Sequence, residues 1–328
     1  MQPTHQPLLE TLNDRSAGLC QIAIRDASQL DVRISKNENI TLLDFGVNRL
    51  GTFEAGLLLS RICMADLAEI SISEPSASSS ISFPQLQVVT PSPIYACIAS
   101  QYAGWPFATE TYYAMVSGPG RLVRGKEKIL EPYPLETTPD SIVICLESDQ
   151  LPGTKECRQL SHEFDELENI FVCVASTNSL PGTLQVIARS IETALHKLHE
   201  LDFDLNLVDR ASGMAPIPPI GKTSFQSLGW TNDSILYGGR VDLWFHSAMA
   251  ELASVVGQIA SCSSPDFGLP FATIFEKYDR DFYKIDRMLF SPAEVGCYSL
   301  KDGQQVIAGQ RRPDILSRSL GESAGTGR

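Results

Sequence analysis

The chain has 328 residues, of which 43% are hydrophobic and 20% charged, a composition typical of a water-soluble globular protein. Its formal net charge of -13 argues against a concentrated basic face, so nucleic acid is excluded as an expected partner. The N-terminus lacks the apolar region of a secretory signal, and no apolar run is long enough for a membrane span. We therefore expect a cytoplasmic protein without a membrane partner. The eight cysteines are scattered without a C-x-x-C pair, which predicts reduced thiols and no structural zinc.

Strand-like and helix-like segments alternate in the first half of the chain. Short apolar runs favour strands, and longer segments with apolar residues at helical spacing favour helices. After an N-terminal helix, the sequence predicts a strand at 40–46, a helix at 51–68, strands at 69–74 and 86–90 around a Ser- and Pro-rich loop at 74–84, a strand at 141–147, a helix at 151–168 and a strand at 169–176. The last two strands are apolar throughout, as expected of strands covered on both faces.

The second half continues the layered pattern. It predicts a helix at 186–200, a Pro-rich loop at 213–224, two strand pieces around a Gly-Gly turn at 234–245, helices at 248–261 and 270–282, and a flexible tail at 311–328. The length favours two lobes, which we place at 1–150 and 151–310 with an approximate boundary; each lobe can be discontinuous in sequence. The predicted fold class is α+β, a layered α/β arrangement in which each lobe is a mixed β-sheet packed with helices.

The helix predicted at 186–200 carries an unusual flank. Its apolar stripe recurs at helical spacing and consists of Leu184, Ile187, Ile191, Ala194, Leu195 and Leu198. Beside the stripe lie Gln185, Arg189, Glu192, His196 and His199, whereas Ser190, Thr193, Lys197 and Glu200 are expected on the solvated back. Two interpretations remain open: a surface face with weak ion pairs, or the wall of a cleft that carries a general base.

Two glycine-rich turns end in arginine. The segment at 118–127 has the Gly and Lys spacing of a phosphate-binding loop, but Glu127 stands where the magnesium-binding hydroxyl belongs, which argues against a nucleotide hydrolase. The segment at 237–240 is similar in its last residues. Arg121 and Arg240 could each offer a forked donor to an anion, and the alternative is a pair of ordinary turns.

The segment at 99–107 places Gln101, Tyr102 and Trp105 around a glycine. An aromatic surface beside amide donors suits a flat heterocycle, and core packing of the same aromatic rings is an equally good explanation.

Further along the chain, Asn232 and Asp233 could bind a ligand or form a helix cap or Asx-turn. Lys284 could reach an anion, or it could pair with Asp281 or Asp286.

Metal-dependent and covalent catalysis find little support in the sequence. His196 and His199 lie three residues apart and could bind zinc together with Glu192, but no H-E-x-x-H motif or third ligand accompanies them. No G-x-S-x-G segment or Cys/His signature is present either. We therefore expect no metal site and no covalent intermediate.

Four short motifs in one order resemble the methenyltetrahydromethanopterin cyclohydrolase family. They are "SQYAGW" at 100–105, "SGPGR" at 117–121, "TND-x-x-x-YGGR" at 231–240 and "DFYKID-x-x-LFSPAE" at 281–294, and "LLDFGVNRLGTFEAG" at 42–56 extends the likeness. Three positions depart from the usual pattern of the family: Val116, Trp230 and Arg287. These departures leave the specificity for the tail of the carrier open.

The resemblance implies that the cyclic methenyl bridge of a reduced pterin carrier is hydrolysed reversibly to the 5-formyl form, in one-carbon metabolism of the kind that supports methylotrophy. It implies a homotrimer of two-lobed subunits, with the pterin in a cleft between the lobes. Tetrahydromethanopterin enters as the substrate, and neither a metal nor a resident cofactor is implied. Arg189 and Glu192 match the catalytic pair of the family. The implied substrate-binding residues are Gln101, Tyr102, Trp105, Ser117, Gly118, Arg121, Asn232, Asp233, Tyr237, Gly239, Arg240 and Lys284.

The chemistry suits this pair of residues. A methenyl bridge is an amidinium-like cation, so attack by water needs only modest activation and correct placement. Glu192 would accept a proton from the water and later return one to the departing nitrogen, while Arg189 would orient the carboxylate. Burial opposes the charge on Glu192 and Arg189 favours it. The alternatives are a non-catalytic pterin-binding protein that retains the cleft, and a subunit interface formed by the Glu192 flank.

Overall fold

The structure is a computed structural model that describes residues 11–75, 81–133, 139–164 and 167–321. The chain forms two compact units, the first from Met1–Ala68 and Ile94–Gln185 and the second from Glu69–Pro93 and Val186–Arg328. Each unit contains a mixed six-stranded sheet packed with helices, which confirms the predicted fold class. The units are discontinuous in sequence, which the prediction allowed, but their boundaries differ from the approximate one that we placed near residue 150.

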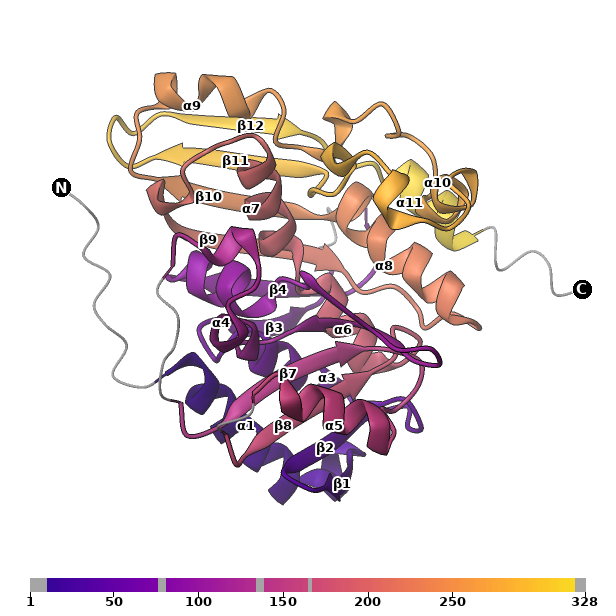
Figure 1. Cartoon of the computed structure of the whole chain (residues 1–328). Helices are drawn as coiled ribbons and strands as arrows, with labels where there is room; N and C mark the ends of the chain where they lie inside the picture. The colour runs from indigo at the N-terminus through magenta and orange to yellow at the C-terminus, as the bar shows by residue number, and fades with distance from the viewer. Residues whose placement is uncertain (1–10, 76–80, 134–138, 165–166, 322–328) are drawn as a thin grey trace, which may run out of the picture. The chain divides into compact units, whose positions relative to one another are not determined.

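The first unit is built on the sheet with strand order β1-β2-β8-β7-β6-β5 (Figure 1). Its strands are β1 (Arg33–Asn37), β2 (Ile40–Gly46), β5 (Trp105–Ala108), β6 (Tyr113–Ser117), β7 (Ile142–Glu147) and β8 (Ile170–Ala175). Its helices are α1 (Leu12–Arg25), α2 (Ala27–Leu30), α3 (Phe53–Cys63), the π-helix η1 (Ile94–Gln101), α4 (Gly120–Arg124), the 3₁₀ helix η2 (Lys128–Leu130), α5 (Thr154–His162) and α6 (Leu180–Ile187), within which the chain passes to the second unit. β2, β8 and β7 run parallel, and the other strand pairs of this sheet are antiparallel.

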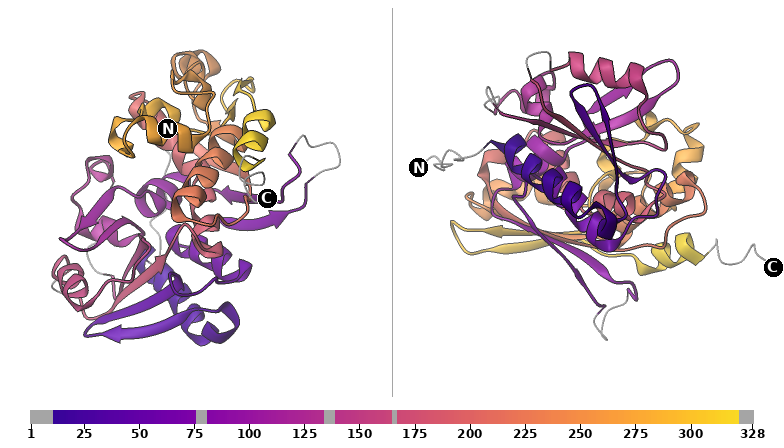
Figure 2. Two further views of the ribbon diagram at one scale, coloured as in Figure 1. Left: turned by 90° about the vertical axis from the view of Figure 1, so that its right-hand side faces the viewer. Right: turned by 90° about the horizontal axis from the view of Figure 1, so that it is seen from below.

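The central strands of this sheet are buried on both faces, as their continuous apolar sequences predict. Side chains alternate across a strand, so Leu43 and Phe45 of β2 join one apolar cluster, together with residues of α1 and α3. Ile40 and Leu42 of the same strand join the other cluster, which includes residues of α5. Figure 2 shows α1, drawn in indigo, lying across the sheet, and α1 contacts β7. Helices therefore cover both faces.

The second unit is built on the sheet with strand order β12-β11-β10-β9-β4-β3. Its strands are β3 (Glu69–Ser73), β4 (Gln85–Thr90), β9 (Val208–Pro216), β10 (Arg240–Phe245), β11 (Glu294–Ser299) and β12 (Gln305–Gly309). Its helices are α7 (Ser190–Glu200), α8 (Ser224–Gly238), α9 (Met249–Val256), α10 (Phe271–Lys277) and α11 (Pro313–Gly321), with 3₁₀ helices η3 (Leu205–Leu207), η4 (Ser261–Ser263), η5 (Phe282–Lys284) and η6 (Arg287–Leu289). β10 and β11 are parallel, and the other pairs are antiparallel.

Helices in this unit occupy two regions. α7 lies along β9 and β10, while α8, α10 and α11 pack together at one end (Figure 1). An apolar cluster that includes Phe271, Phe275 and Leu316 fills the space among the last three helices. α8 begins at a cap because the hydroxyl of Thr223 accepts the amide of Gln226.

Several sequence predictions in the second half were wrong. The segment at 234–239 lies in α8 and the turn that follows it, so only Arg240–Phe245 is a strand. The Pro-rich loop predicted at 213–224 begins inside β9. We predicted a flexible tail at 311–328, but α11 occupies Pro313–Gly321, and its Ile315 and Leu316 are buried. The end of that predicted tail and part of the predicted 74–84 loop lie outside the described residues.

Candidate functional site

The helix that we predicted at 186–200 is divided in two. α6 ends at Ile187, Ala188 and Arg189 form a turn, and α7 begins at Ser190. The amide of Arg189 donates to the carbonyl of Val186, three rather than four residues back, so the first helix ends in a tightened turn. Arg189 consequently occupies the N-cap position of α7.

Glu192 lies in the first turn of α7 and is only 5% exposed. The amides at a helix N-terminus carry partial positive charge and favour a nearby carboxylate, whereas burial disfavours its charge. Glu192 is therefore a buried carboxylate at the N-terminus of a helix.

The apolar stripe beside Glu192 is buried as predicted, but the predicted solvated back is not solvated. Ser190 and Lys197 are both buried, and His199 is the exposed residue of α7. Gly213 on β9 approaches the start of the helix closely: a Cβ there would lie 2.5 Å from the Ser190 Oγ and 2.9 Å from Ile191 Cγ1. α7 is thus a buried helix that packs directly on β9.

Gln101 ends the π-helix of the first unit and is 0% exposed. Its amide nitrogen and amide oxygen have no hydrogen-bond partner in the described part of the chain. Leaving such groups unsatisfied costs about 1 to 3 kcal/mol each, and π-helical turns occur frequently at functional sites. These two features single out Gln101 among the predicted binding residues of its unit.

Arg121 is held inside the first unit by Glu127. Its Nε and Nη2 donate to the two carboxylate oxygens at 2.8 and 2.6 Å, and Nη1 donates to the Ile98 carbonyl at 3.3 Å. The guanidinium also lies over the ring of Tyr102, 5.1 Å from its centroid. The amide of Gly118 donates to the Ser100 carbonyl at 2.7 Å. The structure therefore brings Gln101, Tyr102, Gly118 and Arg121 together, with Arg121 engaged in an internal ion pair.

Contacts within the first unit also involve Trp105, Ser117 and Gly118. Trp105 is buried, contacts Phe107 edge to face and lies under Arg124, whose guanidinium is 4.0 Å from the ring centroid. Ser117 is buried and donates to the Cys145 carbonyl at 3.5 Å. Gly118 has φ of +97°, and a Cβ there would lie 2.9 Å from the Val143 carbonyl oxygen, so this turn requires glycine.

Asp233 and Asn232 lie in the middle of α8 and not at a cap or Asx-turn of their own. The Asp233 carboxylate accepts the amide of Phe271 at 2.8 Å, at the start of α10, and the hydroxyl of Ser319 in α11 at 2.5 Å. Asn232 donates to the Leu228 carbonyl within α8. Burial raises the pKa of Asp233 to about 7. This carboxyl group connects three helices in the fold.

A prediction about pH follows from Asp233. Its folded-state pKa of about 7 lies above the unfolded value of about 3.9, so its stabilising contribution is complete below about pH 4 and is lost as the pH rises through 7. Between these limits, the free energy of unfolding of the wild type should fall by about 1 to 4 kcal/mol relative to Asp233→Asn, whose side chain does not titrate. Urea unfolding at several pH values measures this difference. A difference that stays constant from pH 4 to 7 would contradict the prediction.

Tyr237 and Gly239 lie at the end of α8 and just beyond it. The Tyr237 hydroxyl donates to the Leu269 carbonyl, and burial raises the pKa of this hydroxyl to about 12. A Cβ on Gly239 would lie 2.7 Å from the Ile235 carbonyl oxygen, so the chain turns into β10 only with glycine at this position. Both residues have structural roles in the described molecule.

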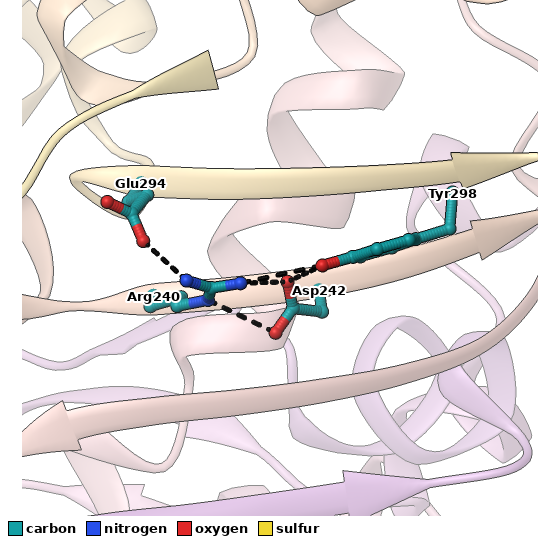
Figure 3. A network of polar contacts seen from close by, with 4 residues as sticks. All are labelled: Arg240, Asp242, Glu294 and Tyr298. Carbon is teal, nitrogen blue, oxygen red and sulfur yellow. Dashed lines mark hydrogen bonds and ion pairs between the residues drawn. The ribbon is translucent and has the colours of Figure 1, made fainter. Parts of the chain in front are cut away.

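Arg240 belongs to a polar network on β10 and β11 (Figure 3). Its guanidinium pairs with Asp242 at 3.0 Å and with Glu294 at 2.9 Å, and the Tyr298 hydroxyl donates to Asp242 at 3.0 Å. The hydrogen bond with Asp242 raises the pKa of Arg240. The guanidinium of Arg240 therefore already has two carboxylate partners, Asp242 and Glu294.

The network faces away from α7. A Cβ on Gly213 would point toward Ser190 and Ile191 of α7, and it would also lie 3.3 Å from the Val241 Cγ2. Val241 therefore lies on the face of the sheet that α7 covers. Side chains alternate along a strand, so Arg240 points to the opposite face of the sheet. The structure therefore does not bring Arg240 together with Glu192.

Lys284 and the three departures from the family pattern also have local partners. Lys284 is exposed, with Nζ 3.4 Å from Asp279. Val116 is buried in the sheet of the first unit. Trp230 donates its indole N–H to the Ser319 carbonyl at 3.1 Å, and Arg287 pairs with Glu200 at the end of α7 at 3.2 Å. Trp230 and Arg287 thus have partners within their own unit.

Lys197 is a residue that the sequence analysis missed. From its charge and its position on the helix, we expected Lys197 on the solvated face. Nothing in the sequence alone shows that hydrogen-bond acceptors from distant segments surround its ammonium group. The structure buries it completely.

His196 and His199 are the residues that we weighed as zinc ligands from the sequence. The rings of His196 and His199 are 6.5 Å apart, and His196 lies 3.6 Å from Glu200. Within the described residues, no three His, Cys, Asp or Glu side chains are grouped so that they could hold a metal ion. No described helix has the length and apolarity needed to cross a membrane.

Comparisons with known proteins agree on one family. The family model described as Cyclohydrolase (MCH) matches residues 11–320. The methenyltetrahydromethanopterin cyclohydrolase of Rhodopirellula baltica is 42% identical over 286 residues, 85% of this chain and 86% of the relative. Proteins of the same name from Methanosarcina mazei and Methanocaldococcus jannaschii are 35% and 36% identical, each over 95% of this chain and 98% of the relative.

Proposed function

Because the chain belongs to the cyclohydrolase (MCH) family, we propose that it hydrolyses 5,10-methenyltetrahydromethanopterin to the 5-formyl form, reversibly, with Glu192 as the general base. The observation that carries the proposal is the match over residues 11–320 in a chain whose Glu192 is buried in the first turn of α7, beside Arg189 at its N-cap. The relatives named above carry the same activity in their names.

The proposed reaction uses few protein groups. Water adds to the bridging carbon as Glu192 accepts one of its protons, and the cationic charge of the bridge is discharged. The bond from that carbon to the nitrogen that does not keep the formyl group then breaks, and Glu192 returns a proton to this nitrogen. The second proton of the water is released. Because the bridge is already electrophilic, the proposal requires neither a metal nor a resident cofactor, and the pterin enters as substrate.

Other residues have supporting roles in the proposal. Arg189 orients the carboxylate of Glu192 and steadies the charge that shifts during addition of water. Gln101 is the strongest candidate for hydrogen bonding to the heterocycle, since an amide offers a donor and an acceptor side by side. Among the other residues given in the sequence analysis, Tyr102 and Gly118 lie close to Gln101 and belong to the same proposal.

A homotrimer is also part of the proposal. On the face of its sheet opposite α7, the second unit exposes Val89 and Ile307, which occupy the same row of strand partners as Asp242. Ser212, Asp242 and Gly296 separate these two side chains, so they do not form one apolar patch, and the homotrimer rests on the resemblance to the family. A solution mass equal to that of one chain would contradict this part.

The activity itself is tested by ultraviolet absorbance. Addition of the purified protein to 5,10-methenyltetrahydromethanopterin should remove the absorbance of the conjugated bridge faster than spontaneous hydrolysis does. A non-catalytic pterin-binding protein would bind the carrier and leave this rate unchanged. Absence of any acceleration, in protein shown to bind the carrier, would favour that second function.

A further inference from the structure

Lys197 on α7 is a charged residue with 0% exposure. Its Nζ donates to the Ala260 carbonyl at 2.7 Å, to the Ser263 hydroxyl at 2.7 Å and to the Met288 carbonyl at 2.5 Å. An ammonium group has three N–H donors, and all three are used here. The acceptors come from two segments, one around η4 and one at η6, so a single side chain connects α7 to both.

The surroundings of this ammonium group contain no direct counter-charge. Among the described residues, no carboxylate lies within ion-pair distance of Nζ, and the groups that favour its charge are Cys262 and Asp286. Burial lowers the pKa of Lys197 to about 8. A buried charge is expensive unless its hydrogen bonds are satisfied, so the three acceptors are essential to this arrangement.

The start of α7 is fixed separately, by the contact of Ser190 and Ile191 with Gly213 described above. At 100° per residue, Ser190 and Lys197 are about 20° apart around the helix, and so they share one face. Glu192 is about 160° away from Ser190, on the opposite face. Ser190 and Lys197 therefore hold one side of α7, and the carboxylate of Glu192, about 160° and 140° away from them, projects from the other.

We infer that Lys197 is a positioning residue for Glu192: its three hydrogen bonds fix the rotation of α7 about its axis and so the place of the carboxylate. This inference rests on the proposed function of Glu192. A side-chain end lies about 6 Å from a helix axis, so a rotation of about 10° moves the carboxylate by about 1 Å. Displacements of that size at a reacting group can cost about 100-fold in rate.

Lys197→Met tests the inference because methionine keeps much of the volume and removes every donor. For folded enzyme, kcat should fall about 10- to 100-fold, while KM changes less than about 3-fold. Lys197→Arg restores charge and donors and should recover part of the loss. Lys301→Met is the control, because Lys301 is an exposed lysine that pairs with Glu251 elsewhere in the same unit.

Hydrogen exchange gives a readout that does not depend on activity. In Lys197→Met, the amides of the first two turns of α7 should exchange at least about 10-fold faster than in the wild type, whereas Lys301→Met should leave them unchanged. Unchanged exchange, or a lower melting temperature with wild-type kcat for each folded molecule, would overturn the positioning role. If the wild type fails to hydrolyse the carrier, the proposed function fails, and exchange still decides whether Lys197 holds α7.

Discussion

Replacing Glu192 by glutamine should lower kcat for hydrolysis of the methenyl carrier by about 100-fold or more, with little change in KM. Glutamine has nearly the same shape but cannot accept a proton from water, and general acid–base catalysis contributes about 10²- to 10⁴-fold. Steady-state absorbance measurements give both constants, and circular dichroism shows whether the variant is folded.

Glu200→Gln is the matched control, because this glutamate ends the same helix and pairs with Arg287 at 3.2 Å. It should retain activity close to that of the wild type. If Glu192→Gln keeps more than about a third of the wild-type kcat, Glu192 is not the general base, since that residual activity is far above the range for loss of proton transfer.

Arg121→Met should destabilise the protein by about 3 to 5 kcal/mol. The guanidinium is 0% exposed and pairs with Glu127, so methionine leaves a nearly buried carboxylate without its partner. Denaturant unfolding followed by circular dichroism measures the loss. This loss would identify Arg121 as a structural residue, in contrast to the anion-binding role that the sequence suggested for it.

Arg158→Met supplies the comparison for Arg121. Arg158 pairs with Glu38 at 3.1 Å, but both side chains are exposed, and such pairs contribute about 0 to 1 kcal/mol. The stability of this variant should therefore be close to that of the wild type. If Arg121→Met instead unfolds like the wild type and raises KM, Arg121 acts on the substrate.

The strands of the first unit could be predicted well because their sequences carry strong local signals. The run at 40–46 coincides with β2, and the uninterrupted apolar runs that became β7 and β8 are buried on both faces. Apolar residues without polar alternation leave few other structures open to a short segment.

Predictions failed where tertiary contacts decide the local structure. The apolar segment before Gly239 has residues common in strands, but it continues α8, whose side chains pack against α10 and α11. The break at Arg189 has no proline or glycine to announce it. Lys197 is charged, and only the folded chain supplies the three acceptors that allow its burial.

The candidate site was predictable to different degrees. The family motifs identify the segments that carry the candidate residues. Glu192 is buried, and burial is common to residues of a protein core and residues of a site. The family motifs do not distinguish residues that bind a ligand from residues that stabilise the local fold. Asp233 and Tyr237 lie in such motifs, yet their polar atoms bond to neighbouring helices and loops of the fold.

The most direct test of the account is a crystal structure with the methenyl carrier, or a stable analogue, bound. The account predicts the carboxylate of Glu192 within hydrogen-bond reach of a water molecule that faces the bridging carbon, with the Arg189 guanidinium beside it. A carrier bound where Glu192 cannot reach that water would contradict the assignment of Glu192 as the general base.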